Sequence, residues 1–335
     1  MWPRLVANKF LMRKGLGSNN FVADFPSSDN SILDIPSLDE PSLSHESTVF
    51  NHHKETHNYR FQEIVPLRAS NVLGSENNKI FMKWNSLIRE TLNKKSQNDK
   101  LEEIQCVSPI KKGKKLIDQS INVPQDFRCI ISKQMVGIFI SVWVRNDLHP
   151  YIRHPSVSCV GCGIMGCLGN KGSVSIRFQL HETSFCFICS HLASGGKEGD
   201  EKHRNSDVAE IFSRTSFPAG GDPSLNLPRN ILDHDRVIFL GDLNYRISLP
   251  EATTRLLVDR REWNTLLEND QDGADEWSSI PRCDRIIWYG KGLKQHIYGR
   301  GESNLSDHRP VKAIFTAQVQ ILRTLKDRQA SLIRQ

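Results

Sequence analysis

A short polar segment after an apolar run carries residue types suited to hydrolytic chemistry. Asp242 and Asn244 directly follow the run VIFL at 237–240. Side chains two positions apart on an extended chain project to the same side. A carboxylate and an amide placed in this way can hold one small polar object, such as a water or a phosphoryl group. The alternative is a Gly-Asp turn that only ends a strand.

A second segment, SDHRPV at 306–311, places a carboxylate beside an imidazole. Asp307 and His308 are adjacent and precede the apolar run VKAIF. Such a pair can transfer a proton or orient a water. The structural alternative is a turn before Pro310.

Single candidates stand at the ends or edges of other predicted strands. They are the histidine of SFCFICSH and the acids of CDR and FQE, namely His191, Asp284 and Glu63. Each is ambiguous alone, because a satisfied structural histidine or an exposed acid fits the same positions.

Composition indicates a folded chain, and its net positive charge is compatible with an anionic partner. The chain has 335 residues, 38% of them hydrophobic, and a net charge of +6. This excludes a wholly disordered protein. Phosphate, nucleic acid or a membrane surface fits a mildly basic charge, but none is required. The longest apolar run, 135–144, is about half of what a bilayer span needs. We expect no secretory signal, and therefore reduced thiols.

Two C-x-x-C pairs, Cys159/Cys162 and Cys186/Cys189, raise the question of a zinc site. The second pair lies in a predicted strand, where an offset of three residues sends two side chains to opposite faces. These two thiols then cannot bind one ion, so buried free thiols are favoured over structural zinc.

The elements that must position these residues follow from hydrophobic periodicity. Residues 1–57 are polar and predict a mostly disordered leader, and a basic linker with KKGKK covers 111–115. The pattern predicts a strand end at 61–67 and helices at 79–93, 198–214 and 250–270. Strands are predicted at 127–132, 134–144, 172–180, 184–191, 236–242, 283–289, 294–299 and 309–319. The mixture predicts one α/β domain over 58–318 and a short basic tail over 319–335.

The polar segments in their order along the chain resemble the endonuclease/exonuclease/phosphatase superfamily. They are FQE, GNKG, SHL, GDLNYR, CDR and SDHRPV. The longer segments GDLNYRIS, CDRIIWYGKGLKQ and RGESNLSDHRP more narrowly resemble plant inositol polyphosphate 5-phosphatases. The resemblance implies a four-layer α/β/β/α sandwich. It also implies Mg²⁺-dependent removal of the 5-phosphate from phosphoinositides or soluble inositol polyphosphates.

The resemblance also implies roles for the catalytic and metal-binding positions. Glu63 matches the family's metal-binding glutamate, and Mg²⁺ prefers such oxygen ligands. Asp242 matches the residue that orients or deprotonates the attacking water. Asn244 matches an amide that helps to hold the phosphoryl group. His191 matches a histidine that contacts the scissile phosphate.

Further matched positions concern the second acid–histidine pair and the substrate. Asp307 and His308 match the family's Asp-His pair, and Asp284 matches the acid that fixes the tautomer of that histidine. The match places the pair Asn170 and Lys171 near the inositol 1-phosphate. Arg246 matches the position that binds the neighbouring 4-phosphate, where a guanidinium is a suitable donor.

Two departures from the family pattern imply an incomplete sandwich. A T-W-N-V-G-G strand is absent near 60/61, and an F-x-P-T-Y-K-Y segment with a 4-phosphate-binding lysine is absent between 270 and 280. Arg282 stands where the family has tryptophan. An alternative is therefore a catalytically impaired splice form, or the product of an incorrect gene prediction, that at most binds phosphoinositides. A superfamily nuclease is a weaker alternative.

The resemblance further predicts partners and location. We expect a phosphoinositide or inositol polyphosphate substrate, peripheral contact with an anionic membrane surface and no nucleic acid. The expected location is the cytoplasm and its membrane surfaces, with the nucleus as a second compartment. The sequence indicates no oligomeric state.

Overall fold

The structure is a computed structural model that describes residues 56–65, 78–105, 127–163, 170–219, 226–271, 283–303 and 306–321. The predicted leader up to residue 55, the KKGKK linker and the basic tail after Ile321 lie outside these residues. No helix within them is long and apolar enough to cross a membrane.

A five-stranded sheet forms the centre of the molecule. Its strand order is β4-β5-β6-β7-β8, with β6 and β7 parallel and all other neighbours antiparallel. The strands are rich in β-branched and aromatic residues, which favour a pleated, buried surface. Their bounds are Ile152–Gly161, Gly172–Leu180, Thr183–His191, Arg236–Asp242 and Asp284–Tyr289.

Two smaller sheets complete the β structure. One has the order β1-β3-β2, and the other pairs β9 with β10. All of their strand pairs are antiparallel. The bounds are β1 Thr56–Phe61, β2 Phe127–Met135, β3 Ile138–Arg145, β9 Leu293–Arg300 and β10 Val311–Ala317.

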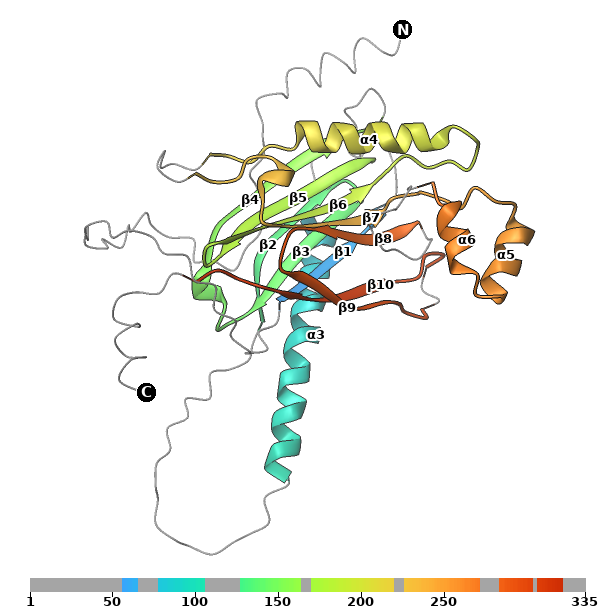
Figure 1. Cartoon of the computed structure of the whole chain (residues 1–335). Coiled ribbons are helices and arrows are strands. Elements are labelled where there is room, and N and C mark those ends of the chain that lie inside the picture. Colours follow the sequence, from blue (N-terminus) through green and yellow to red (C-terminus); the bar gives the residue numbers. More distant parts are fainter. Residues whose placement is uncertain are drawn as a thin grey trace, which may run out of the picture.

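One helix packs on the outer face of each of the two larger sheets, and the longer of these two helices extends well beyond its sheet (Figure 1). Helix α3 (Asn78–Gln105) packs on the β1-β3-β2 sheet through Phe81 and Ile88, and α4 (Asp200–Arg214) packs on the five-stranded sheet through Ile211. Two short helices lie beyond the end of β7, α5 (Glu251–Asp259) and α6 (Trp263–Glu268). Two short 3-10 helices span His149–Tyr151 and Ile231–Asp233.

The largest hydrophobic core lies between the five-stranded sheet and the β1-β3-β2 sheet. Alternate residues of β3 (Ile138, Ile140, Val142, Val144) face alternate residues of β5 and β6 across it. Together with the two outer helices this gives the predicted α/β/β/α layers, so the predicted fold class is confirmed.

The cysteine prediction is confirmed for the second C-x-x-C pair. Cys186 and Cys189 both lie on β6, are buried and form no disulfide within the described residues. Cys186 packs in the core under α4, whereas Cys189 packs between the sheets. The two sulfur atoms therefore lie on opposite faces and cannot share a zinc ion.

Two predicted elements differ from the structure, and one observed strand has no predicted counterpart. Residues 134–144 are not one strand, because β2 and β3 form a hairpin that turns at Val136 and Gly137, with Val136 at φ 52°. A Cβ on Gly137 would lie 3.2 Å from the Glu63 Cα, so glycine permits this close approach. The predicted helix 250–270 is two helices, interrupted where Arg261 takes φ 58°. Strand β4 was not predicted.

The predicted gap at 60/61 falls inside a continuous strand. Residues Thr56–Phe61 pair with β3 from Val144 to Phe139 without a break. The last residues of the predicted leader thus supply the first part of β1. The second predicted gap, between 270 and 280, falls at residues 272–282, which lie outside the described part of the chain.

Candidate active site

Three neighbouring strands bring three predicted site residues into one row. Because β6 and β7 are parallel, both end at the same edge of the sheet, where His191 is the register partner of Asp242. Strand β8 runs antiparallel to β7 and begins at that edge, where Asp284 is the register partner of Asp242. The local sequence determines where each strand ends, and the pairing of the strands brings the side chains of these three residues close together.

Asp242 lies at the centre of this row and accepts hydrogen bonds from several sides. Its Oδ2 lies 3.3 Å from His191 Nε2 and 3.1 Å from Asn244 Nδ2, and its Oδ1 accepts the Asn244 backbone N–H at 3.1 Å. Asn244 Nδ2 also donates to the Leu192 carbonyl at 3.0 Å, and Asn244 adopts φ 56°. Asn244 therefore fixes the Asp242 carboxylate to the end of β6.

The surroundings of Asp242 keep its carboxylate ionised. Burial by itself raises the pKa of this carboxyl, but the hydrogen bond and charge of His191, the charge of His308 and the Asn244 N–H together lower the pKa below its usual value of 3.8. An ionised, buried carboxylate is suited to orient a water or to accept its proton.

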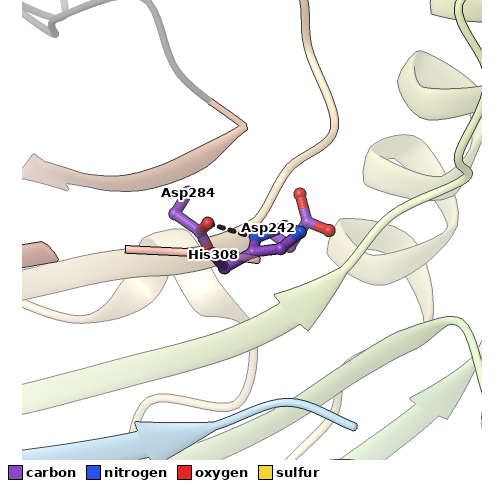
Figure 2. Close-up of side chains that lie close together, drawn as sticks. All are labelled: Asp242, Asp284 and His308. Carbon is purple, nitrogen blue, oxygen red and sulfur yellow. Dashed lines mark hydrogen bonds and ion pairs between the residues drawn. The ribbon is translucent and has the colours of Figure 1, made fainter. Parts of the chain in front are cut away.

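His308 and Asp284 form a second acid–histidine pair facing Asp242 (Figure 2). His308 Nδ1 lies 2.6 Å from Asp284 Oδ2, and one ligand atom from each of these three residues lies within 4.8 Å of the others. Burial lowers the pKa of His308, but the hydrogen bond to Asp284 and the charges of Asp284, Asp242 and Asp307 outweigh it and raise the pKa above 6.5. The fold thus favours the imidazolium form.

We expect His308 to titrate above pH 6.5 in the metal-free protein and to titrate at lower pH in Asp284→Asn. Because the folded-state pKa is raised, the stabilisation from this charge is complete below pH 6.5 and disappears as the pH rises through the folded-state pKa. NMR titration of the imidazole nitrogens in EDTA measures both values. His154, whose pKa burial lowers, is the internal reference and should not respond to the substitution. An unchanged His308 titration in Asp284→Asn would contradict the assignment of the pair.

Lys171 lies against the histidine of the row. Its Nζ is 2.6 Å from His191 Nε2. Burial lowers the pKa of Lys171, and the charges of Asp242, Glu63 and Asp207 offset part of this shift. The structure therefore brings this ammonium beside His191 and within electrostatic reach of Asp242.

The remaining predicted residues lie outside the row. Glu63 is exposed, and its charge acts on Lys171, but it is outside the Asp242–Asp284–His308 cluster. Asp307 is exposed and accepts the Ser306 hydroxyl at 3.1 Å. Its charge raises the pKa of His308, but no hydrogen bond or ion pair joins Asp307 to the row within the described residues. Asn170 has a buried Oδ1 without a hydrogen-bond partner among the described residues.

Arg246 lies on the rim of the same site. Its side chain is exposed, and its guanidinium passes 3.8 Å from the position that a Cβ on Gly196 would take. The charges of both Arg246 and Asp242 act on the Cys283 thiol, whose pKa is raised mainly by burial.

Buried arginines beneath the site were missed by sequence reasoning. Arg204 and Arg285 are both 0% exposed, and their guanidinium carbons lie 5.5 and 5.9 Å from the centroid of the Tyr245 ring. The motif CDR contains Arg285, but the motif predicts only its acid, Asp284, as a site residue. Arg204 lies in an ordinary polar helix sequence that contains no signal of burial.

A hard divalent cation fits the donor set of this site. The carboxylates of Asp242 and Asp284 are oxygen ligands of the kind that such ions prefer, whereas the predicted ligand Glu63 lies outside their cluster. His308 fits less well as a ligand, because its Nδ1 is occupied by Asp284 and its raised pKa favours protonation. The chemistry of the residues thus agrees with a cation held by carboxylates beside an imidazolium.

Comparison with known proteins agrees with the fold. The profile described as Endonuclease/Exonuclease/phosphatase family 2 matches residues 20–278. The chain is 53% identical over 399 aligned positions to the type IV inositol polyphosphate 5-phosphatase 9 of Arabidopsis thaliana, with 96% of this chain and 93% of that protein covered. It is 44% identical to the type I inositol polyphosphate 5-phosphatase 8 of the same plant, covering 78% of this chain and 64% of that protein.

A solved structure is also similar. It is the inositol polyphosphate 5-phosphatase domain of SPsynaptojanin in complex with inositol (1,4)-bisphosphate and calcium ion. The TM-score is 0.59 and the identity 26%, with 83% of this chain and 78% of that domain covered.

Fold, site and relatives together define a member of the endonuclease/exonuclease/phosphatase superfamily. Within it, the chain belongs to the inositol polyphosphate 5-phosphatases. The 399 aligned positions of the first relative exceed the 335 residues of this chain by 64, so at least 64 positions of that alignment face gaps in this chain. This length difference agrees with missing internal segments but does not locate them.

Proposed function

We propose that this chain hydrolyses the 5-phosphate of phosphoinositides such as phosphatidylinositol 4,5-bisphosphate, or of soluble inositol polyphosphates. The observation that carries the proposal is the row of His191, Asp242 and Asp284 at one sheet edge, with the His308 imidazole opposite. The relatives' names support the reaction class, and the inositol bisphosphate of the solved domain supports the ligand class.

Each residue of the row has a role that its surroundings support. Asp242, ionised and fixed by Asn244, orients the attacking water and accepts its proton. His191, which lies beside Asp242, contacts the scissile phosphate, and Lys171, whose ammonium lies against His191, supplies positive charge for the inositol 1-phosphate side of the ligand. His308, held by Asp284 in its protonated form, stabilises negative charge on the phosphoryl oxygens.

The cofactor in this proposal is Mg²⁺, held through Glu63 and the neighbouring carboxylates. When bound, the ion neutralises phosphoryl oxygens and lowers the pKa of bound water. The calcium ion of the similar domain supports a divalent cation at this site, and the oxygen donors support magnesium. We also propose peripheral contact with an anionic membrane surface from the cytoplasm, since the substrate lipids are anionic and the net charge is +6.

Phosphate release from phosphatidylinositol 4,5-bisphosphate in vesicles tests the proposal. We expect release with Mg²⁺ and none in excess EDTA. The same assay with inositol 1,4,5-trisphosphate tests soluble substrates. The second candidate function is a catalytically impaired form that binds phosphoinositides. It is favoured by the 64 or more positions of the first relative's alignment that face gaps in this chain. Vesicle binding without phosphate release would support this second candidate and contradict the first.

We expect weak discrimination between lipids with and without a 4-phosphate. Arg246 remains, but the lysine of the P-T-Y-K segment does not. A lost hydrogen bond to a charged group is worth roughly 1.5–3 kcal/mol, or about tenfold to a hundredfold in specificity. The measurement is the ratio of kcat/KM for phosphatidylinositol 4,5-bisphosphate to that for phosphatidylinositol 3,5-bisphosphate. A ratio of about a thousandfold or more would show that recognition survives without that lysine.

A further inference from the structure

The backbone of Arg246 is held by a residue that no motif contains. Gln271 accepts the Arg246 backbone N–H on its Oε1 at 3.1 Å, and its own backbone N–H donates to the Arg246 carbonyl at 3.0 Å. The neighbouring residues Ile247 and Asp270 form an isolated β-bridge. The segment that follows β7 is thus paired with residues 270–271, about 25 positions further along the chain.

A buried arginine fixes the side chain of Gln271 in this position. Arg204 of α4 donates from Nη2 to Gln271 Oε1 at 2.6 Å and from Nη1 to the Gly195 carbonyl at 3.1 Å. Arg204 is 0% exposed, so water competes little for these hydrogen bonds. The Gln271 Oε1 atom therefore joins the Arg204 guanidinium to the Arg246 N–H.

The same arginine also holds the loop over which the Arg246 side chain passes. Gly195 belongs to the segment that follows His191, and the Arg246 guanidinium lies 3.8 Å from the Cβ position of the next residue, Gly196. Gln271 and this glycine loop are thus two supports of Arg246 that share Arg204. By contrast, no side-chain ion pair of Arg246 is found within the described residues, which leaves the guanidinium exposed at the rim.

We propose that Gln271 is a positioning residue for Arg246 and thereby determines how strongly the site discriminates ligands with a phosphate at ring position 4. This inference rests on the proposed function, since it takes Arg246 as a phosphate-binding residue. No hydrogen bond among the described residues joins Gln271 to the row of His191, Asp242 and Asp284, so Gln271 acts through Arg246. A guanidinium recognises a phosphate well only when its direction is fixed.

The test uses binding, so it does not depend on turnover. The probes are inositol 1,4-bisphosphate and inositol 1-phosphate, and calorimetry with the full chain and Mg²⁺ gives the ratio of their Kd values. We expect the parent to prefer the bisphosphate only about tenfold, as for one charged hydrogen bond, in agreement with the weak discrimination expected above. Gln271→Ala should lose most of this preference, whereas Gln271→Glu, which retains an acceptor oxygen, should recover it to within about threefold.

Two further variants separate positioning from a general structural effect. Gln320→Ala, at an exposed glutamine whose backbone N–H donates to Thr183, is the matched control and should leave the ratio unchanged. Arg246→Ala should abolish the preference, and adding Gln271→Ala to it should cause no further loss, because the two residues act as one unit.

Several outcomes would overturn the inference. They are a parent that binds both probes equally or neither, an unchanged ratio in Gln271→Ala, or fully additive losses in the double variant. A Gln271→Ala variant that weakens both probes equally and melts at a lower temperature would show a structural role only. Phosphate release by the parent tests the proposed function separately, so its absence alone does not decide the role of Gln271.

Discussion

Replacement of Asp242 by alanine is expected to lower kcat/KM for phosphatidylinositol 4,5-bisphosphate by about 10²-fold or more relative to the parent chain. The carboxylate is the central group of the row, and its lowered pKa keeps it ionised and able to orient a water near neutral pH. Its removal leaves His191 and Asn244 without the group that they share. Initial rates of phosphate release with Mg²⁺ measure the effect.

Two further variants show whether the loss of activity in Asp242→Ala is specific to the charge at this position. Asp242→Asn keeps the volume and one acceptor oxygen but loses the charge, and it should lose nearly as much activity. Asp259→Ala removes an exposed carboxylate at the end of α5 and should leave the rate unchanged. Full turnover by Asp242→Ala, or by the parent in excess EDTA, would refute the proposed mechanism.

Replacement of Arg285 by methionine is expected to lower the free energy of unfolding by about 3–5 kcal/mol. Arg285 Nη2 lies 2.8 Å from Asp270 Oδ1, and both side chains are 0% exposed. The variant leaves the buried Asp270 carboxylate without this opposite charge, and burial of such a charge is costly. Urea unfolding followed by circular dichroism measures the loss.

The double variant Arg285→Met/Asp270→Leu should recover part of that loss, because replacing both members of a buried pair costs less than removing one. Arg153→Met breaks an exposed pair with Glu182 and is the matched control, with an expected loss below about 1 kcal/mol. A loss in Arg285→Met no larger than in the control would show that the buried pair does not stabilise the fold.

The sequence by itself determined most of the elements and which polar residues stand at the strand ends. The run VIFL predicted a strand buried on both faces, and β7 is such a strand. The three-residue offset of Cys186 and Cys189 predicted opposite faces, because side chains alternate along any strand. The motifs named the family, which the fold and the relatives confirm. These features depend on local periodicity or on short contiguous motifs.

The tertiary structure decided which of these residues meet. Asp242 joins His191 through parallel pairing and Asp284 through antiparallel pairing, and no local pattern contains that register. The contact of Lys171 with His191 likewise depends on the pairing of β5 with β6. These pairings are fixed by burial of the sheet faces over the whole domain.

The same dependence explains the elements that local reasoning missed. The hairpin at Val136 and Gly137 interrupts an apolar run that reads as one strand, because both halves bury their faces in the same core. The buried Arg204 and Arg285 belong to a residue type that is usually exposed. Their burial depends on the carbonyl groups, Gln271 and Asp270, which only the folded chain brings to them.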